Sequence, residues 1–478
     1  MKQFTEYLTN DEVIRVHEAS LEVLEDVGVK VRHERAKEIF LKHGCIEKDD
    51  HLVKIPAKVV DEFMQMTIPT FTFRGRDPEF DKTIPQDSPV VITGSSAPNL
   101  IDPKTGEHRR ATSEDIANIA FLINELPGID VFSISTLADD APQGQFSLSR
   151  FYPAAKNCKK PIRGNTPSIS DLKMVLKLGE IIAGSKAAYE AQPFFTLHCC
   201  PIISPLTYDF DSTELIIYTT ENNIPSYPTI VPNGGMASPL SLLGSLVQAN
   251  AEFLSLTVLR MMIKPGAPHI YATLPVISDM RSGDYPPGAI ETGILHAAHN
   301  QMARYYNLPA GGYIGLTGAH TCDAQSGYET GMSTMVGLLG GTDMFNMAGL
   351  LGALMEFDFG KLAIDSEISE MLKKTKSGFR FDEDELCIDV IKEVGPGGTF
   401  IDKMHTFENM KDAAFLPKIA TREMRDTWKE KGSKDVRTRA MELINEILSL
   451  PNYSAISQEV DRQIKQTFPG IVKGDSVW

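Results

Sequence analysis

The chain has 478 residues, of which 42% are hydrophobic and 23% charged, as in a soluble globular protein of one large domain with additions or of two or three domains. The formal net charge of -16 excludes a surface built to bind nucleic acid or anionic lipid, because such a surface needs basic patches. Six scattered cysteines without a CxxC pair argue against a disulfide framework and a structural zinc site, and no apolar run approaches the ~20 residues of a membrane span. Since the N-terminus is polar and has no signal peptide, we expect a protein of the reducing cytoplasm.

Residues 1–88 are predicted to form a helical and mixed N-terminal cap. Thr9 or Asn10 can cap a first amphipathic helix that buries Val13 and Val16, and Gly28 ends it. Short strands and turns follow up to about residue 80, without the regular pattern that begins near residue 90.

The middle of the chain repeats a short apolar segment eight times at near-even spacing, with helical patterns in between. The segments are Val90–Thr93, Asp130–Ser135, Pro161–Gly164, Phe194–Cys199, Ser226–Val231, His269–Leu274, Gly311–Leu316 and Met344–Ala348. Strands without alternation are typical of parallel sheets that are buried on both faces. We therefore predict an α/β protein with a (β/α)8 TIM barrel over residues 89–376. A doubly wound open sheet is the alternative.

The regular spacing stops after residue 376. Helical patterns return over Thr421–Glu430, Lys434–Leu450 and Ser457–Thr467. Residues 377–478 are therefore predicted to be a C-terminal helical segment that packs on the barrel.

A barrel of this kind carries its site on the loops at the carboxyl ends of the strands. Those loops or strand ends contain Ser95, Ser96, Asn165, His198, Asn233, Arg281, His320, Cys322, Asp323, Gln325, Glu356, Phe357 and Phe359. No metal-binding HxH or HExxH spacing is present, although His198, His320 and an aspartate remain conceivable ligands. His320 could act as a general acid or base. Cys322 could be a nucleophile or a small buried side chain. Asp323 could be an ordinary helix N-cap.

Aromatic side chains gather around the seventh and eighth predicted strands. They are Tyr313, Phe345, Phe357 and Phe359. One interpretation is core packing. The other is an aromatic box for a quaternary ammonium, in which each good cation–π contact contributes ~0.5–2 kcal/mol.

Ordered blocks along nearly the whole chain resemble the trimethylamine methyltransferase superfamily. The blocks are Val16–Val29, Val53–Pro56, Phe73–Pro78, Asp102–Arg109, Leu308–Pro309, Asp323–Glu329, Lys403–Thr406 and Trp428. The founding members use pyrrolysine to take a methyl group from trimethylamine, and this chain has no such residue. It therefore resembles the non-pyrrolysine branch, whose members demethylate quaternary amines such as glycine betaine, proline betaine or carnitine and methylate a separate corrinoid protein.

The resemblance implies a site that binds and aims the substrate, because the nucleophile is the Co(I) corrinoid of the partner protein. It implies that this chain itself binds no cofactor and no metal, and that its partners are a small quaternary amine and a cognate corrinoid protein. We expect the four aromatic side chains above to face the cation, with Glu356 or Asp323 as its carboxylate. The expected donors to the substrate's own carboxylate are His198, Asn233, Arg281 and His320.

His320, Asp323 and Gln325 are expected to hold and orient the substrate from the seventh loop. We also expect a homo-oligomer, without nucleic-acid or membrane partners. The alternatives are a barrel hydrolase or lyase with His320 and Asp323 as its acid–base pair, and a non-catalytic betaine-binding protein.

Overall fold

The computed structural model describes residues 4–48, 51–379, 381–452 and 454–478. All eight expected segments contain strands, and the predicted α/β class is confirmed. The strands are β6 (Val90–Thr93), β9 (Phe132–Ser133), β10 (Ile162–Gly164), β11 (Phe195–Cys199), β14 (Ser226–Pro228), β16 (Tyr271–Thr273), β18 (Ala310–Tyr313) and β19 (Met344–Ala348).

These strands form two four-stranded parallel sheets. The order is β9–β10–β11–β14 in one sheet and β6–β19–β18–β16 in the other. Single parallel bridges, Ile92 with Val131 and Ile230 with Thr273, link the two sheets at both ends. Because every pairing is parallel, the carboxyl ends of all eight strands point the same way.

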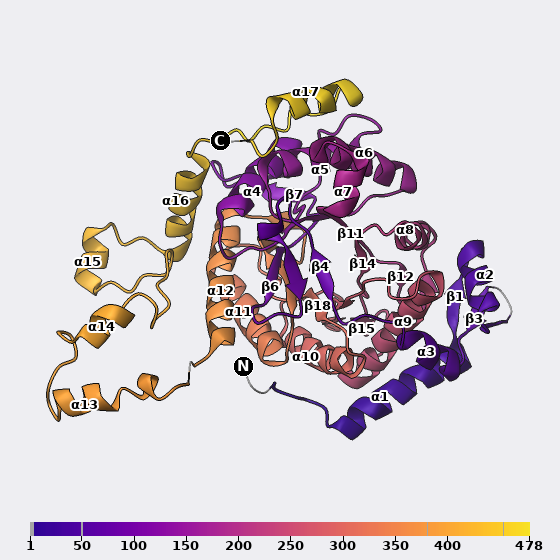
Figure 1. The fold of residues 1–478 in the computed structure, drawn as a ribbon, viewed down its shortest axis with the longest axis horizontal. Helices are drawn as coiled ribbons and strands as arrows, with labels where there is room; N and C mark the ends of the chain where they lie inside the picture. Colours follow the sequence, from indigo (N-terminus) through magenta and orange to yellow (C-terminus); the bar gives the residue numbers. More distant parts are fainter. Residues whose placement is uncertain (1–3, 49–50, 380, 453) are drawn as a thin grey trace.

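A helix follows each of the eight strands, and Figure 1 shows these helices arranged around the central strands. They are α4 (Ser113–Glu125), α5 (Phe146–Asn157), α6 (Ile169–Ala183), α8 (Phe210–Glu221), α9 (Leu242–Ile263), α10 (Ile290–Tyr305), α11 (Ala324–Leu339) and α12 (Phe359–Ser377), with a short α7 (Lys186–Ala191) after α6. A capping box begins α4, in which Thr112 and Asp115 accept each other's backbone N–H groups.

In the described part of the chain, α9 is the one helix long and apolar enough to cross a membrane. Most of it is buried against α1 (Asn10–Glu22), α3 (Ala57–Met64) and α10. Its uniform hydrophobicity is therefore that of a core helix packed on several sides.

The N-terminal segment shares a sheet with a loop of the eight-stranded region. The sheet has the order β12 (Ile202–Ile203), β13 (Thr207–Tyr208), β1 (Val29–Val31), β3 (Leu52–Lys54), β2 (Ile46–Glu47), in which β1 pairs with β13 from the loop after β11. The helix α2 (Glu34–Lys42) and a π-helical turn at Val23–Val27 complete this cap. The cap and α9 contribute to one hydrophobic core, so the N-terminal segment is not a separate unit.

A hairpin of β4 (Phe71–Phe73) and β5 (Lys82–Ile84) lies at the amino ends of the strands. Phe71 and Phe73 pack there with Val90, Val131 and Met344. This hydrophobic cluster fills the amino-terminal end of the strand assembly, so an internal site is accessible from the carboxyl end.

Additional short strands lie at the carboxyl end of the eight parallel strands. One sheet has the order β20 (Leu350–Leu351), β21 (Glu356–Phe357), β7 (Asn99–Ile101), β8 (His108–Arg110), and β15 (Asn233–Gly234) pairs with β17 (Val276–Ile277). These pairings hold the loops that surround the mouth of the central region.

The C-terminal residues divide into two parts. α16 (Val436–Leu448) packs on α12 and α4, and α17 (Gln458–Thr467) packs on α6. α13 (Ile388–Val394), α14 (Met404–Asn409) and α15 (Arg425–Glu430) instead lie apart from the central body in Figure 1. None of the described residues of 379–418 is buried, and their contacts with α12 include Lys374 with the Asp412 carbonyl at 2.8 Å and the Lys418 N–H with Glu367 at 2.7 Å.

Gly312 in β18 makes a close contact that no other residue type would permit. Its φ is 146°, and an added Cβ would lie 1.8 Å from the Thr273 carbonyl oxygen in β16. We predict that Gly312→Ala lowers the free energy of unfolding by about 3 kcal/mol, through overpacking against backbone. Denaturant unfolding measures this loss. Gly318→Ala is the matched control, because its Cβ would meet no atom within 4 Å. Equal unfolding midpoints for the two variants would disprove the contact.

Candidate functional site

A cavity of about 350 Å³ lies at the carboxyl ends of the parallel strands. The strands β6, β9, β10, β11, β14, β16 and β18, or the residues directly after them, all contribute to its wall. The lining residues include Ser95, Ser96, Ser133, Arg163, Asn165, His198, Cys199, Cys200, Val231, Leu274, Tyr313 and Leu354. The carboxyl end of a parallel sheet is the usual location of a ligand site in this fold class.

Arg163 is a fully buried cation in the wall of this cavity. Its guanidinium lies between two aromatic rings, 5.2 Å from the ring centre of Tyr227 and 5.3 Å from that of Tyr313. It donates to the Tyr313 hydroxyl at 2.9 Å and to the Ser133 hydroxyl at 3.1 Å. The two rings and two hydroxyls fix its orientation, while its Nε–H has no partner among the described residues.

Among the residues that the structure describes, no carboxylate balances this charge. None of the sixteen described residues that line the cavity is aspartate or glutamate, and Arg163 forms no ion pair within the described chain. A buried ion without a counter-ion costs several kcal/mol. The cavity therefore provides a binding position for an anionic group of a ligand.

A second buried arginine strengthens the positive potential. Arg150 in α5 donates to the Asn165 side chain at 2.9 Å and to the Ser96 hydroxyl at 3.1 Å, and both acceptors line the cavity. Burial lowers the pKa of Arg150 to about 10, so it stays cationic at neutral pH.

His198 and Cys199 in the wall are neutral. Burial, with a smaller contribution from Arg163, holds the pKa of His198 well below 6.5. Burial raises the pKa of the half-buried Cys199 thiol well above its usual range, whereas Cys200 is exposed. A protonated thiol is a poor nucleophile, so Cys199 suits a packing role in the cavity wall.

Of the substrate-binding residues predicted from the sequence, the structure brings Tyr313 and His198 into the cavity. Their ring centres are 5.9 Å apart. The hydroxyl of Tyr313 also contacts that of Ser95 at 2.7 Å. Ser95, Ser96 and Asn165, which the strand-end rule also selected, line the same cavity.

The predicted aromatic box is not assembled. Phe345, Phe357 and Phe359 lie in the main hydrophobic core, and Phe359 packs against Trp478. Tyr313 belongs to a different small cluster beside the cavity. The sequence places these residues at neighbouring strand ends, but the backbone directs the phenylalanine rings outward, toward the helices.

The predicted catalytic loop lies outside the cavity wall. Asp323 is the N-cap of α11 and accepts the N–H groups of Gln325 and Ser326, the ordinary role that the sequence left open. Gln325 donates to Glu329 at 2.9 Å, and the side chain of His320 is exposed. Because the Asp323 carboxylate is used for capping, the structure does not form the proposed His320–Asp323 acid–base pair. Burial raises the pKa of the Cys322 thiol to about 12, which argues against Cys322 as a nucleophile.

The remaining predicted residues have partners elsewhere. Glu356 contacts His108 at 2.9 Å, Asn233 accepts from the Ser278 hydroxyl at 2.7 Å, and the exposed Arg281 forms an ion pair with Asp279 at 2.6 Å. None of the three lines the cavity. Their predicted contacts with a substrate therefore have no support in the geometry.

Arg163 was not among the predicted site residues, because those residues were taken from the loops that follow the strands. Arg163 lies inside the apolar segment Pro161–Gly164. A charged residue within a strand that is buried on both faces is rare, and that was the available signal.

The family model of trimethylamine methyltransferase (MTTB) matches residues 2–468, almost the whole chain. The chain belongs to this family. The trimethylamine methyltransferase MttB of Desulfitobacterium hafniense is 30% identical, over 97% of this chain and 93% of the relative. A glycine betaine methyltransferase of the same species is 31% identical, over 96% and 95%, and the MttB of Methanosarcina barkeri is 30% identical, over 95% and 92%.

A solved dihydropteroate synthase from Coxiella burnetii covers 64% of this member of the family and 99% of its own chain, with 13% identity and a TM-score of 0.37. A TM-score this low carries no information about activity.

The buried histidine behind Tyr313 gives a pH prediction. His296 in α10 donates to the Tyr313 carbonyl at 2.8 Å, and burial lowers its pKa to about 4. Below about pH 6.5 this histidine binds a proton in the unfolded chain but not in the folded chain. Its contribution therefore lowers the free energy of unfolding by about 1.4 kcal/mol for each pH unit below that point. We predict that His296→Gln makes the decline of stability between neutral pH and pH 5 shallower. Denaturant unfolding at several pH values measures this slope, and an unchanged slope would contradict the assignment.

Proposed function

We propose that this chain demethylates a quaternary amine that carries a carboxylate, of the glycine betaine, proline betaine or carnitine type, and transfers the methyl group to the Co(I) corrinoid of a separate protein. The observation that carries the proposal is the buried, unpaired Arg163 in a cavity whose described lining contains no acid. The family and its methyltransferase relatives support the reaction class.

The relatives alone do not select the substrate. A trimethylamine enzyme and a glycine betaine enzyme are almost equally similar to this chain, at 30% and 31% identity. Trimethylamine is a protonated cation at neutral pH, and a cation without a carboxylate would be repelled by Arg163 and Arg150. A zwitterionic betaine places its carboxylate on the guanidinium and keeps its ammonium group toward the neutral wall.

The cavity also offers contacts for the cationic end of the substrate. His198 is neutral, so it adds no positive charge near the ammonium, and the rings of His198 and Tyr313 are available for contact. One face of Tyr313 is already occupied by Arg163. Orientation therefore depends mainly on the carboxylate, which fixes one end of the substrate and points the N-methyl groups away from Arg163.

The proposed reaction needs little chemistry from this chain. The corrinoid of the partner protein would supply the nucleophile and accept the methyl group, and the substrate nitrogen would keep both electrons of the carbon–nitrogen bond that breaks. The product is a neutral tertiary amine, so no proton has to be delivered. The side chains described here bind, orient and desolvate the substrate, which is consistent with the raised pKa of the Cys199 thiol.

We also propose that the eight strands form a closed (β/α)8 barrel. The bridges Ile92–Val131 and Ile230–Thr273 support closure, because they connect the two sheets at both ends. In a closed barrel Arg163 points inward from its strand, and the substrate lies on the barrel axis. The reducing conditions that Co(I) requires fit a cytoplasmic location.

Arg163→Gln tests the carboxylate contact. We predict that kcat/KM for methyl transfer from glycine betaine to the Co(I) corrinoid protein falls about 100-fold or more, because a charge-assisted contact in a desolvated site is lost. Arg163→Lys should recover part of this loss, since it restores the charge without the planar fork.

Arg281→Gln is the matched control. It removes an arginine that the sequence also suggested, but one whose side chain is exposed and paired with Asp279. Wild-type kinetics in Arg163→Gln, with the fold verified by circular dichroism, would refute the assignment.

His320→Ala tests the loop that the sequence favoured. Because the exposed His320 does not line the cavity, we predict a change in kcat/KM of about threefold or less, and no change in substrate affinity. A loss of affinity similar to that of Arg163→Gln would contradict this prediction and show that the loop after β18 belongs to the substrate site.

A further inference from the structure

A second group of polar side chains lies in the cavity wall, nearer the mouth than Arg163. Asn165 directly follows β10, two residues beyond Arg163, and residues two apart along an extended strand are separated by about 6.6 Å. Ser96, after β6, contacts the Asn165 side chain at 3.4 Å, and Thr166 is the next residue of the chain. Ser96, Asn165 and Thr166 all line the cavity. The cavity therefore has two polar regions, one at Arg163 and one at Asn165.

Arg150 fixes the direction of the Asn165 amide. Its guanidinium, in α5, donates to the side-chain oxygen of Asn165 at 2.9 Å and to the Ser96 hydroxyl at 3.1 Å. Arginine has donors and no acceptor, so the amide has to turn its oxygen toward Arg150. The Nδ2 group of Asn165, with two N–H donors, is thereby directed away from Arg150. It has no partner among the described residues, so these donors are available to a ligand in the cavity.

Two further observations favour a ligand contact in this region. The side chain of Thr166 is almost completely buried in the cavity wall, and its hydroxyl has no partner in the described chain. Ser96 has a φ of 64°, a conformation that is unfavourable for a residue with a Cβ and that is often found at ligand sites. Buried polar atoms are nearly always hydrogen-bonded in folded proteins. An unpaired hydroxyl beside oriented N–H donors therefore suits a polar group of a ligand.

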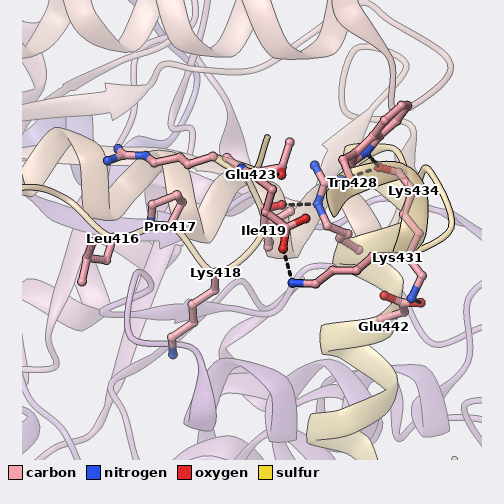
Figure 2. A pocket seen from close by; sticks show the side chains of 13 residues that line it. Leu416, Pro417, Lys418, Ile419, Glu423, Trp428, Lys431, Lys434 and Glu442 are labelled. Atoms are coloured by element: carbon pink, nitrogen blue, oxygen red, sulfur yellow. Dashed lines mark hydrogen bonds and ion pairs between the residues drawn. The ribbon is translucent and has the colours of Figure 1, made fainter. Parts of the chain in front are cut away.

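The basic surface cavity of the C-terminal segment differs in this respect. Figure 2 shows this cavity, of about 440 Å³, with Lys431 directed toward Glu423. Lys431 forms an ion pair with Glu423, and Lys434 forms one with Glu442. Residues of the chain itself thus neutralise these two lysines, and the cavity needs no ligand. Arg150, in contrast, forms no ion pair with any residue that the structure describes.

The position of Asn165 relative to Arg163 limits which substrates reach both regions. With the carboxylate on Arg163 and the N-methyl groups toward the mouth, the atoms beside Asn165 belong to the chain between the two ends of the substrate. Glycine betaine has a single methylene there, which accepts no hydrogen bond. The N–H donors of Asn165 then lose water without gaining an acceptor, and this loss weakens binding. A substrate with a hydrogen-bonding group along its chain avoids the loss.

We propose that Asn165 and Ser96 select a betaine with a hydroxyl between its carboxylate and its ammonium group, and that Arg150 is the positioning residue for this contact. The inference rests on the function proposed above, because it requires the carboxylate on Arg163. The N–H groups of Asn165 donate to the oxygen of the substrate hydroxyl. The hydroxyls of Ser96 and Thr166 are available as acceptors for its proton. Glycine betaine still binds through Arg163, but it lacks this second contact.

Two substrates that differ by one hydroxyl test the selection. Carnitine has a hydroxyl between its carboxylate and its ammonium group, and 4-(trimethylammonio)butanoate is the same molecule without it. Isothermal titration of the full chain, without the corrinoid protein, should give a Kd about 30-fold lower for the preferred enantiomer of carnitine, because the analogue leaves the Asn165 donors unpaired. Affinities within about threefold of each other, or tighter binding of the analogue, would overturn the proposal.

Asn165→Ala should remove most of this preference. Binding of carnitine should weaken about 30-fold, whereas binding of the deoxy analogue should change by about threefold or less, since the analogue makes no contact with the amide. Asn222→Ala is the matched control, because this exposed amide contacts only the Tyr218 carbonyl in α8. An Asn165→Ala variant that keeps the wild-type ratio of the two Kd values would overturn the proposal.

The ratio of the two Kd values also separates positioning by Arg150 from a purely structural role. Arg150→Gln should lower the ratio as Asn165→Ala does, because glutamine no longer fixes the direction of the amide, and Arg150→Lys should restore part of it. Equal weakening of both ligands would contradict the positioning role. If Arg150→Gln does not fold, Asn165→Ala, at an exposed position, still decides the selection.

The selection and the proposed function fail in different ways. If neither betaine binds, or if Arg163→Gln leaves both affinities unchanged, the carboxylate contact is wrong and the proposed function fails with it. If both betaines bind through Arg163 with equal affinity, the function stands and only the selection by Asn165 and Ser96 is overturned.

Discussion

The arrangement of the site depends on one buried charge. Arg163 occupies the interior of a strand assembly that is otherwise lined by hydroxyls, thiols, rings and aliphatic side chains. Water would solvate this guanidinium far better than two hydroxyls and two ring faces do, so the folded chain retains an unfavourable electrostatic term. A ligand carboxylate removes that term, and this makes the substrate's anionic end the natural anchor.

The rest of the fold holds the charge in position. Gly164 follows Arg163 in β10, and an added Cβ there would lie 2.5 Å from the ring of Phe151 in α5. Tyr227 supports Arg163 from β14, and Tyr313, whose carbonyl is bonded to His296, covers it from β18. The hairpin residues Phe71 and Phe73 fill the opposite end. The substrate therefore meets a fixed cation, consistent with a chain that positions a reactant for a nucleophile brought by another protein.

The sequence predicted the fold much better than the site. Eight short, mainly apolar segments predict buried parallel strands, and each overlaps a strand of the structure. The side-chain directions at strand ends are not encoded in this pattern, which is why Tyr313 reaches the cavity while Phe357 and Phe359 enter the core. Asp323 shows a second limit, because a capping aspartate and a catalytic aspartate have the same local sequence signature. Residues 379–418 show a third limit, because the sequence pattern predicted no helix there, although α13 and α14 form.

The most direct test of the central claim is a crystal structure of the chain with glycine betaine. The account predicts the substrate carboxylate within about 3 Å of the Arg163 guanidinium, with the trimethylammonium group directed toward the carboxyl end of the strands. A carboxylate bound elsewhere, or an ammonium group adjacent to Arg163, would contradict it.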